Sequence, residues 1–377
     1  MFYKNARIYC SDFQFHTGAF EVTEDGKFGA VLPENVPADA IDLQGATVIP
    51  GLCDVHNHGN SGEDFSDGNY EGLVKIAKYL ASQGITSFAP ASMTLPYDVL
   101  EKAFATGRKL ADTQPDGCSR IMGIQMEGPY FSEKKKGAQN GAYLKTPDFE
   151  GFKKLYEGCG GLVRIVDLAP ELPGSKEFVE QAKELCTVSV AHTDSDYDHA
   201  KMAFDAGATH LTHLYNGMPS IHHRNPGVIP AAAENNKVRA EIICDGLHIH
   251  PASVRLAFNM FGADRMIIIS DALRCCGMPD GEYELGGQQV FLAGGIAKLS
   301  DGTIAGSATN LFECMRRAMS FGIPETDAVR AASYNPACSL GAQDKIGSIE
   351  TGKLADFVVC NSDYSAKTVY IGGKAIA

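Results

Sequence analysis

The stretch that decides the fold is residues 121–127, IMGIQME, an apolar run that ends in an acid. Three further runs end in a polar residue in the same way: TVSVAH at 187–192, ATHLTH at 208–213 and MIIISD at 266–271. Strands of a parallel barrel are buried on both faces, so they read as continuous apolar runs, and their carboxyl ends open on one mouth. The residues that end these runs are therefore expected to lie together at that mouth: Glu127, His192, His213 and Asp271.

The region around these runs repeats an alternation of strand and helix. Apolar runs suited to strands occur at 48–55, 85–92, 121–127, 163–169, 187–192, 208–213, 239–245 and 266–271. Helical patterns separate them, such as the one that opens at Pro251 and ends before Gly262. Eight parallel strands close a barrel. The sequence therefore predicts an α/β protein whose residues 48–343 form a TIM-type (β/α)₈ barrel.

The two ends of the chain differ from this middle region. Residues 1–47 and 344–377 contain short strand-like pieces separated by turn residues. We expect both ends to meet in one small β-sandwich domain beside the barrel. Residues 276–300 have the same character, and two alternatives stay open for them: a part of the sandwich, or a hairpin at the mouth of the barrel.

Composition narrows the classes of function. The 377 residues include 33 Lys and Arg against 46 Asp and Glu, which gives a formal charge of −13 and argues against nucleic acid or an anionic membrane as a partner. The 11 cysteines contain no CxxC spacing, as expected for reduced thiols. With no long apolar run and no signal-like N-terminus, the chain is expected to be cytoplasmic.

The residues at the strand ends suit a divalent metal ion. A carboxylate and two imidazoles leave an open position on zinc or iron, where a water molecule becomes a nucleophile near neutral pH. The expected ligands of this ion are Glu127, His192 and His213. Asp271 is placed to take a proton from the water and to pass it to a leaving amine. The sequence therefore predicts a metal-dependent hydrolase.

A second ion is an open alternative at the first strand. In the segment HNH, extended backbone points His56 and His58 to the same face, so the pair offers two more ligands. One or two ions per subunit are therefore expected. His210 lies three positions before His213 and faces the other way on a strand, so we assign it to packing.

Taken in order along nearly the whole chain, eight segments resemble the N-acetylglucosamine-6-phosphate deacetylases of the amidohydrolase superfamily. They are PGLCDVHNH, MEGPYFSEKKKGA, AHTDSD, THLYNGM, RNPG, CDGLHI, SDAL and GKLADFVV. The resemblance implies a (β/α)₈ barrel with a small β-sandwich domain and a homodimer. It also implies hydrolysis of the acetamide of N-acetylglucosamine 6-phosphate, which gives glucosamine 6-phosphate and acetate.

The resemblance further implies roles for single residues. The family's metal ligands fall on Glu127, His192 and His213, and its catalytic acid and base falls on Asp271. His248, in the CDGLH segment, resembles the residue that polarises the acetyl carbonyl.

Two more parts of the resemblance concern the phosphate. Asn216 and the backbone of Gly217 resemble the family's phosphate-binding turn. Arg224 resembles the arginine that reaches the phosphate in the neighbouring subunit of the dimer, a role that suits a guanidinium group.

Gln139 departs from the family pattern, which usually has His near the sugar at this position. Glutamine can hydrogen-bond a hydroxyl but carries no charge. An N-acetylgalactosamine-6-phosphate deacetylase therefore stays the main alternative. A cyclic amidase would offer a Lys on the fourth strand, and VRIVDLAPE, residues 163–171, contains none. A non-catalytic sugar-phosphate-binding relative would have lost a ligand or the acid, and none is lost.

Overall fold

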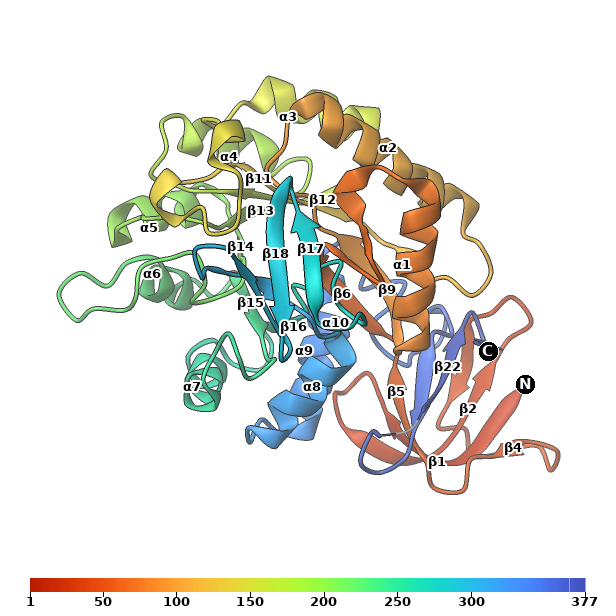
Figure 1. Cartoon of the computed structure of the whole chain (residues 1–377). Coiled ribbons are helices and arrows are strands. Elements are labelled where there is room, and N and C mark those ends of the chain that lie inside the picture. Colours follow the sequence, from red (N-terminus) through yellow and green to blue (C-terminus); the bar gives the residue numbers. More distant parts are fainter. Residues whose placement is uncertain (366, 377) are drawn as a thin grey trace.

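The computed structural model describes residues 1–365 and 367–376, and parallel strands lie at its centre (Figure 1). These strands are β6 (Leu52–Asn57), β9 (Ile85–Pro90), β11 (Ile124–Tyr130), β12 (Val163–Leu168), β13 (Thr187–Val190), β14 (His210–Leu211), β15 (Arg239–Ile243) and β16 (Met266–Ile269). β6 pairs with β9, and β11 to β16 pair in chain order. Parallel bridges from Ala91 to Gln125 and from Asn57 to Ala272 join the two groups at both edges. The eight strands therefore form a closed series in which each strand pairs with the next, and we call them the strand circuit.

Helices connect the strands and lie around the outside of the circuit (Figure 1). They are α1 (Tyr70–Ser82), α2 (Tyr97–Thr113), α3 (Phe149–Gly158), α4 (Ser175–Ala182), α5 (Tyr197–Ala206), α6 (Val228–Glu234), α7 (Pro251–Phe261), α8 (Leu311–Ser320), α9 (Glu325–Ala332) and α10 (Tyr334–Ser339). α7 has the bounds expected from Pro251 and Gly262, and the side chain of His250 caps its first turn. Among the described residues, no helix is both long and apolar enough to cross a membrane.

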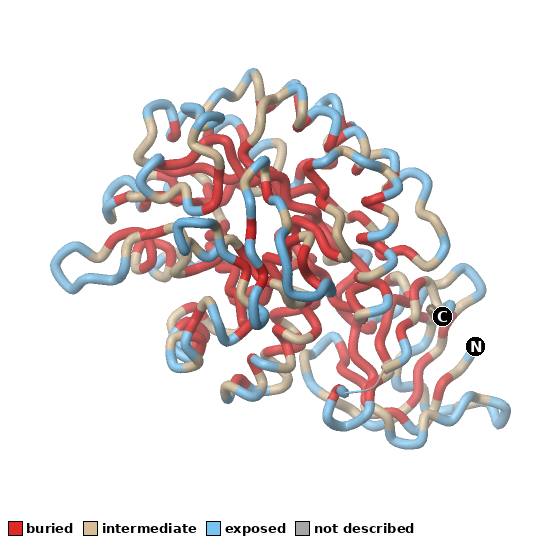
Figure 2. The backbone as a smooth tube through the Cα atoms, in the orientation of Figure 1, coloured by how far each residue is buried: buried red, intermediate tan, exposed pale blue. Residues whose placement is uncertain are grey.

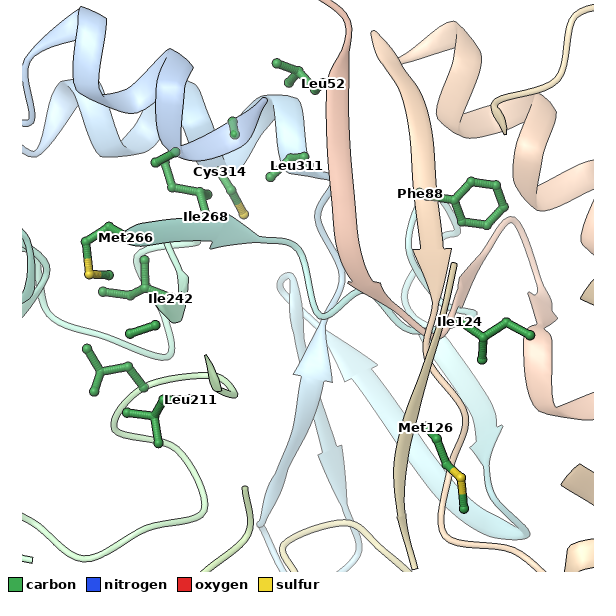
Figure 3. Close-up of a cluster of buried hydrophobic side chains, with 14 of the residues drawn as sticks. Leu52, Phe88, Ile124, Met126, Leu211, Ile242, Met266, Ile268, Leu311 and Cys314 are labelled. Atoms are coloured by element: carbon green, nitrogen blue, oxygen red, sulfur yellow. The ribbon is translucent and has the colours of Figure 1, made fainter. Parts of the chain in front are cut away.

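Apolar side chains fill the space between the strands and the helices. Figure 3 shows Leu52, Ile124, Ile268 and Leu311 in this core, and all four are fully buried. Figure 2 shows the same division along the backbone, with buried strands inside and exposed loops outside. Burial of a side chain of this size contributes about 1.5–3 kcal/mol, so this core provides a rigid frame for the strand ends.

The first strand of the circuit begins later than the sequence predicts. The expected strand at 48–55 is divided at Gly51: β5 (Thr47–Pro50) belongs to another sheet, and β6 begins at Leu52. A Cβ at Gly51 would lie 2.1 Å from Oγ1 of Thr86, so only glycine allows the chain to pass this point. Both strands are fully buried, and the apolar pattern therefore gave no sign of the division.

Strands from both ends of the chain form one sheet, which we call the terminal sheet. It contains β1 (Phe2–Tyr9), β2 (Phe15–Val22), β3 (Phe28–Val31), β4 (Ile41–Asp42), β5, β21 (Phe357–Cys360), β22 (Lys367–Ile371) and β23 (Lys374–Ala375). Its order is β23-β22-β21-β5-β1-β2-β3, with β4 beside β1. Figure 1 shows the two chain ends side by side in this sheet.

The terminal sheet curves around its own aromatic core. β3 and β21 stand four strand spacings apart, which is about 19 Å in a flat sheet. The ring centroids of Phe28 and Phe357 are nevertheless 5.9 Å apart, and those of Phe20 and Phe357 are 5.1 Å apart. The sheet must therefore bend until its separated strands face each other.

Residues between β16 and α8 form a third, smaller sheet. Its antiparallel strands are β17 (Gly281–Leu285), β18 (Gln288–Ala293), β19 (Ile296–Leu299) and β20 (Ile304–Ser307). A bridge from Ser307 to Ala272 attaches it to the end of the strand circuit. Beside it, a hairpin of β7 (Gly59–Asn60) and β8 (Glu63–Asp64) follows β6.

We expect Phe357→Ala to lower the free energy of unfolding by about 3–5 kcal/mol, the usual loss for a buried phenylalanine. Phe357 is fully buried and also stacks on Tyr370 at 4.4 Å. Urea denaturation measures the change. Phe291→Ala is the matched control, because Phe291 is 37% exposed and its loss should change stability by no more than about 0.5 kcal/mol. Equal effects of the two substitutions would contradict the importance of this core.

Candidate metal centre

The four polar residues that end the apolar runs lie together at one end of the strand circuit. Glu127 lies within β11. His192, His213 and Asp271 each follow the last residue of their strand by two positions. All four side chains are largely buried. The parallel strands therefore bring to one place residues that stand up to 144 positions apart, from 127 to 271.

Three of these residues share an unusual backbone conformation. The φ angles are 42° at His192, 30° at His213 and 48° at Asp271, all in the left-handed region that residues other than glycine rarely adopt. Such residues cost of order 1–3 kcal/mol each. The same strain at the same position of three strands indicates that this end of the circuit is shaped to present side chains.

Three ligand atoms converge in the first group of the site. Nε2 of His192 lies 3.1 Å from Oε1 of Glu127, and Nε2 of His213 lies 3.2 Å from the same oxygen. The two Nε2 atoms are 3.1 Å apart. Zinc bonds of about 2.0–2.1 Å in a tetrahedron separate the ligand atoms by about 3.3 Å. The spacing of the three atoms therefore fits a single metal ion.

The outer nitrogens of the two imidazoles also support a cation at this point. Nδ1 of His192 donates to the backbone oxygen of Lys135 at 2.8 Å, and Nδ1 of His213 donates to that of Asn216 at 3.1 Å. A carbonyl oxygen only accepts, so in each neutral ring Nδ1 carries the proton and Nε2 presents a lone pair. Two lone pairs and a carboxylate then face one another, and this arrangement needs a positive charge between them.

A second group lies beside the first and shares Glu127. Nε2 of His58 lies 3.3 Å from Oε2 of Glu127 and 3.4 Å from Oδ1 of Asp271. Nε2 of His56 lies 3.6 Å from both Oε1 of Glu127 and Oδ1 of Asp271, and this buried atom has no hydrogen-bond partner among the described residues. His56, His58 and Glu127 therefore form a second set of ligand atoms suited to an ion.

Opposite charges hold the proton affinities of these residues far from their ordinary values. Burial favours a neutral Glu127, but the charge of His56 together with the contacts to His192 and His213 holds its pKa well below the usual range. Burial also favours a neutral His58, but Asp271 and Glu127 raise its pKa to about 10. In the metal-free protein, protons on histidine thus supply the positive charge that an ion would otherwise bring.

Glu241 is an important residue that the sequence reasoning missed. It is fully buried in β15, where its carboxylate lies 3.0 Å from Nδ1 of His56, accepts from the backbone N–H of His213 at 3.2 Å, and lies 2.9 Å from Nε2 of His210. Burial opposes its charge, but His56 and His210 hold its pKa far below the ordinary value. The available signal was an acid inside the apolar run RAEII, residues 239–243.

A cavity of about 180 Å³ opens beside the candidate metal ligands. Its lining includes Gln139, Asn216, Gly217 and His248, all of which the sequence placed near the substrate. Gly217 has φ 62°, and a Cβ there would lie 3.0 Å from Nδ1 of His192. A glycine at this position therefore lets the chain pass close to the imidazole of His192.

His248 lines the cavity, and a contact with Asp245 fixes the orientation of its ring. Nδ1 lies 2.6 Å from Oδ2 of Asp245, whose other oxygen accepts from the backbone N–H groups of Leu247 and His248. Burial lowers the pKa of His248, but the bond to Asp245 raises it above the ordinary value. Asp245, in the same CDGLH segment, was not recognised from the sequence. Its carboxylate favours the protonated ring of His248, in which Nε2 carries a proton that it can donate toward the cavity.

Arg224 is not brought to the cavity of its own chain. It is exposed in a loop, where its Nη1 donates to Nε2 of His223 at 2.8 Å. The lining of the cavity, within the described part of the chain, contains neither Lys nor Arg. Within the described residues, a single chain therefore brings no Lys or Arg side chain to a phosphate at this place.

Comparisons with known proteins agree with this site. The profile of the amidohydrolase family matches residues 47–376. N-acetylglucosamine-6-phosphate deacetylase of Bacillus subtilis (strain 168) is 38% identical over 353 residues, which cover 90% of this chain and 88% of that protein. N-acetylgalactosamine-6-phosphate deacetylase of Escherichia coli O157:H7 is 31% identical over 352 residues, which cover 93% of this chain and 92% of that protein.

A solved structure also matches this chain, with a TM-score of 0.93. It is an aspartate-to-alanine mutant of N-acetyl-D-glucosamine-6-phosphate deacetylase from Mycobacterium smegmatis, in complex with N-acetyl-D-glucosamine-6-phosphate. Its identity is 30%, and the match covers 100% of this chain and 99% of that chain.

The chain belongs to the amidohydrolase family. The fold and the convergent His and Glu ligands described above are consistent with this class of protein. Within the class, its similarity is to the N-acetylglucosamine-6-phosphate deacetylases, which confirms the resemblance drawn from the sequence motifs.

We expect the metal-free protein to lose stability as the pH rises from about 6.5 to 10. The pKa of His58 in the folded protein, about 10, exceeds its ordinary value of 6.5. Its charge therefore stabilises the fold fully below pH 6.5, and this contribution is lost as the pH rises through 10. Thermal unfolding of chelator-treated protein at several pH values measures the effect.

His58→Gln should remove this part of the pH dependence, whereas His199→Gln, at an exposed position, should keep it. The same pH dependence in His58→Gln and in the unaltered protein would contradict the assignment.

Proposed function

We propose that the protein is a metal-dependent N-acetylglucosamine-6-phosphate deacetylase, which hydrolyses the acetamide of its substrate to glucosamine 6-phosphate and acetate. The observation that carries the proposal is the convergence of Glu127, His192 and His213 on one point, with Asp271 beside them. The names of the relatives and solved structures supply the substrate.

We also infer that the strand circuit is the (β/α)₈ barrel of the amidohydrolase superfamily, and that the terminal sheet is a separate small domain. The circular pairing of eight parallel strands supports the first inference. The second is supported by the separate hydrophobic cluster, rich in aromatic side chains, that packs against the terminal sheet.

The proposed reaction assigns Glu127, His192 and His213 as ligands of a zinc or iron ion. Such an ion supplies a Lewis acid that makes water nucleophilic near neutral pH. His56 and His58 would hold a second ion, so each subunit would carry one or two.

Asp271 moves the proton in this proposal. It accepts a proton from the attacking water and then delivers it to the amine nitrogen as the C–N bond breaks. Burial opposes its charge, but His58 and His56 hold its pKa below the ordinary value, so it is ionised at neutral pH as a base must be. His248 donates to the acetyl oxygen, where negative charge develops during the attack.

The phosphate in this proposal is bound by two subunits. Asn216 and the backbone of Gly217 line the cavity but bring no charge. A dianionic phosphate needs a cation, and a guanidinium group binds it with two parallel hydrogen bonds. We therefore propose a homodimer in which the exposed Arg224 of each subunit enters the cavity of the other.

Among the hexosamines, N-acetylglucosamine is favoured over N-acetylgalactosamine. The glucosamine relative is 38% identical and the galactosamine relative is 31% identical over similar lengths. An assay of acetate release from both 6-phosphates, with metal content measured on the same sample, tests this choice. Metal-loaded protein that releases no acetate from either compound would disprove the proposed function.

We expect Asp271→Asn to reduce turnover by about 10²- to 10⁴-fold, because an amide can neither accept nor deliver the proton. The proposed ligands of the first ion remain in place, so the variant should still bind a metal ion. Acetate release and metal content measured on one preparation check both statements. Turnover close to that of the unaltered protein would contradict the role of Asp271.

Arg224→Ala should raise KM for N-acetylglucosamine 6-phosphate by about 10- to 100-fold, the usual loss for hydrogen bonds to a charged group. It should change the weaker hydrolysis of unphosphorylated N-acetylglucosamine little. Lys237→Ala is the matched control, since Lys237 is an exposed cation outside the cavity lining. Equal effects of Arg224→Ala on both compounds would remove Arg224 from the phosphate site.

A further inference from the structure

Gln139 is held by both ends of its side-chain amide. Its Oε1 accepts the backbone N–H of Thr94 at 2.7 Å, and its Nε2 donates to Oε2 of Glu127 at 2.7 Å. The residue is 3% exposed. The sequence placed Gln139 beside the sugar. The structure shows that it lines the cavity and also contacts the buried carboxylate of the metal centre.

The neighbours of Gln139 fix the direction of its amide. The backbone N–H of Thr94 can only donate, so the carbonyl end of the amide must face it. The NH₂ end then faces Oε2 of Glu127 at 2.7 Å, and a carboxylate oxygen accepts this hydrogen bond. Reversal of the amide would place a donor against a donor and an oxygen against a carboxylate. Gln139 therefore has one stable orientation, which does not depend on a bound sugar.

The contact divides the two oxygens of Glu127 between different partners. Oε2 is held by Gln139, with Nε2 of His58 at 3.3 Å. Oε1 faces two other imidazoles, at 3.1 Å from Nε2 of His192 and 3.2 Å from Nε2 of His213. A carboxylate held at one oxygen cannot rotate freely, so the other oxygen stays directed at the two imidazoles. Groups that hydrogen-bond a metal ligand in this way commonly set its orientation and its affinity for the ion.

We propose that Gln139 is a positioning residue for Glu127 and determines how tightly the chain holds its divalent ion. This inference rests on the metal site of the proposed function. The bond to Thr94 also ties the ion to the loop after β9, so Gln139 links the metal site to the wall of the cavity. Its second N–H can still face a sugar, and the two roles must therefore be separated by experiment.

The test is the zinc affinity of metal-free protein, measured by competition with a chromophoric chelator. Gln139→Met keeps the length of the side chain but loses both hydrogen bonds. Gln139→Asn keeps the amide but is too short to reach both partners. We expect each to bind zinc about 10- to 100-fold more weakly. A purely sugar-binding role of Gln139 would raise KM for N-acetylglucosamine 6-phosphate and leave the zinc affinity unchanged.

Two further variants sharpen the result. Gln139→His should restore the affinity, because a neutral imidazole can accept from Thr94 with one nitrogen and donate to Glu127 with the other. Gln288→Ala is the matched control. It removes an amide that donates to the backbone oxygen of Ala138 in the same loop but does not contact Glu127, so zinc affinity should not change.

Unchanged zinc affinity in Gln139→Met and Gln139→Asn, with a raised KM, would overturn the proposal and make Gln139 a sugar-binding residue. A Gln139→His variant as weak as Gln139→Met would also overturn it. Failure of the proposed function has a different signature: metal-loaded, unaltered protein would release no acetate, while the zinc affinities would remain measurable.

Discussion

The site depends on one buried carboxylate. Glu127 is 2% exposed, and an ionised group removed from water to this degree is unstable unless other groups compensate its charge. Four imidazoles and one amide surround it within 3.6 Å. These partners come from different strands and loops, which the strand circuit places close together. The carboxylate then joins them by direct contacts. A cation at this point would complete the same compensation, so metal binding would also stabilise the local fold.

A layer of buried polar groups contacts the candidate metal ligands and orients them. Glu241 holds His56 and the backbone of His213, and His210 in turn contacts Ser339. The expectation that His210 is structural agrees with these contacts, although it supports the site through Glu241. Asp167 lies in the same interior, bonded by Gln125 and Thr212, and burial with the neighbouring carboxylates raises its pKa well above the ordinary range. The interior of the circuit is therefore partly polar, as a rigid support for charged ligands requires.

The sequence predicted that Glu127, His192 and His213 would lie together because their positions depend on local pattern. An apolar run that ends in His, Glu or Asp can be read directly, and parallel strands bring such ends together. Other features depend on tertiary contacts between segments that are distant in the sequence. The division at Gly51 follows from contact with Thr86, and the contact of Gln139 with Glu127 follows from the path of a loop. The residue types within either segment form no pattern from which these contacts could be predicted.

The two ligand groups differ in how firmly they are held, and this bears on the number of ions. In the group of His192 and His213, both outer nitrogens donate to backbone carbonyls, so both lone pairs are directed inward. In the other group, His56 is fixed by Glu241, but Nδ1 of His58 has no hydrogen-bond partner among the described residues. His58 must also lose a proton, held by Asp271 and Glu127, before it can bind a metal. The group of His192 and His213 therefore has the smaller cost of ion binding and should fill first, with the group of His56 and His58 filling at higher pH or higher metal concentration.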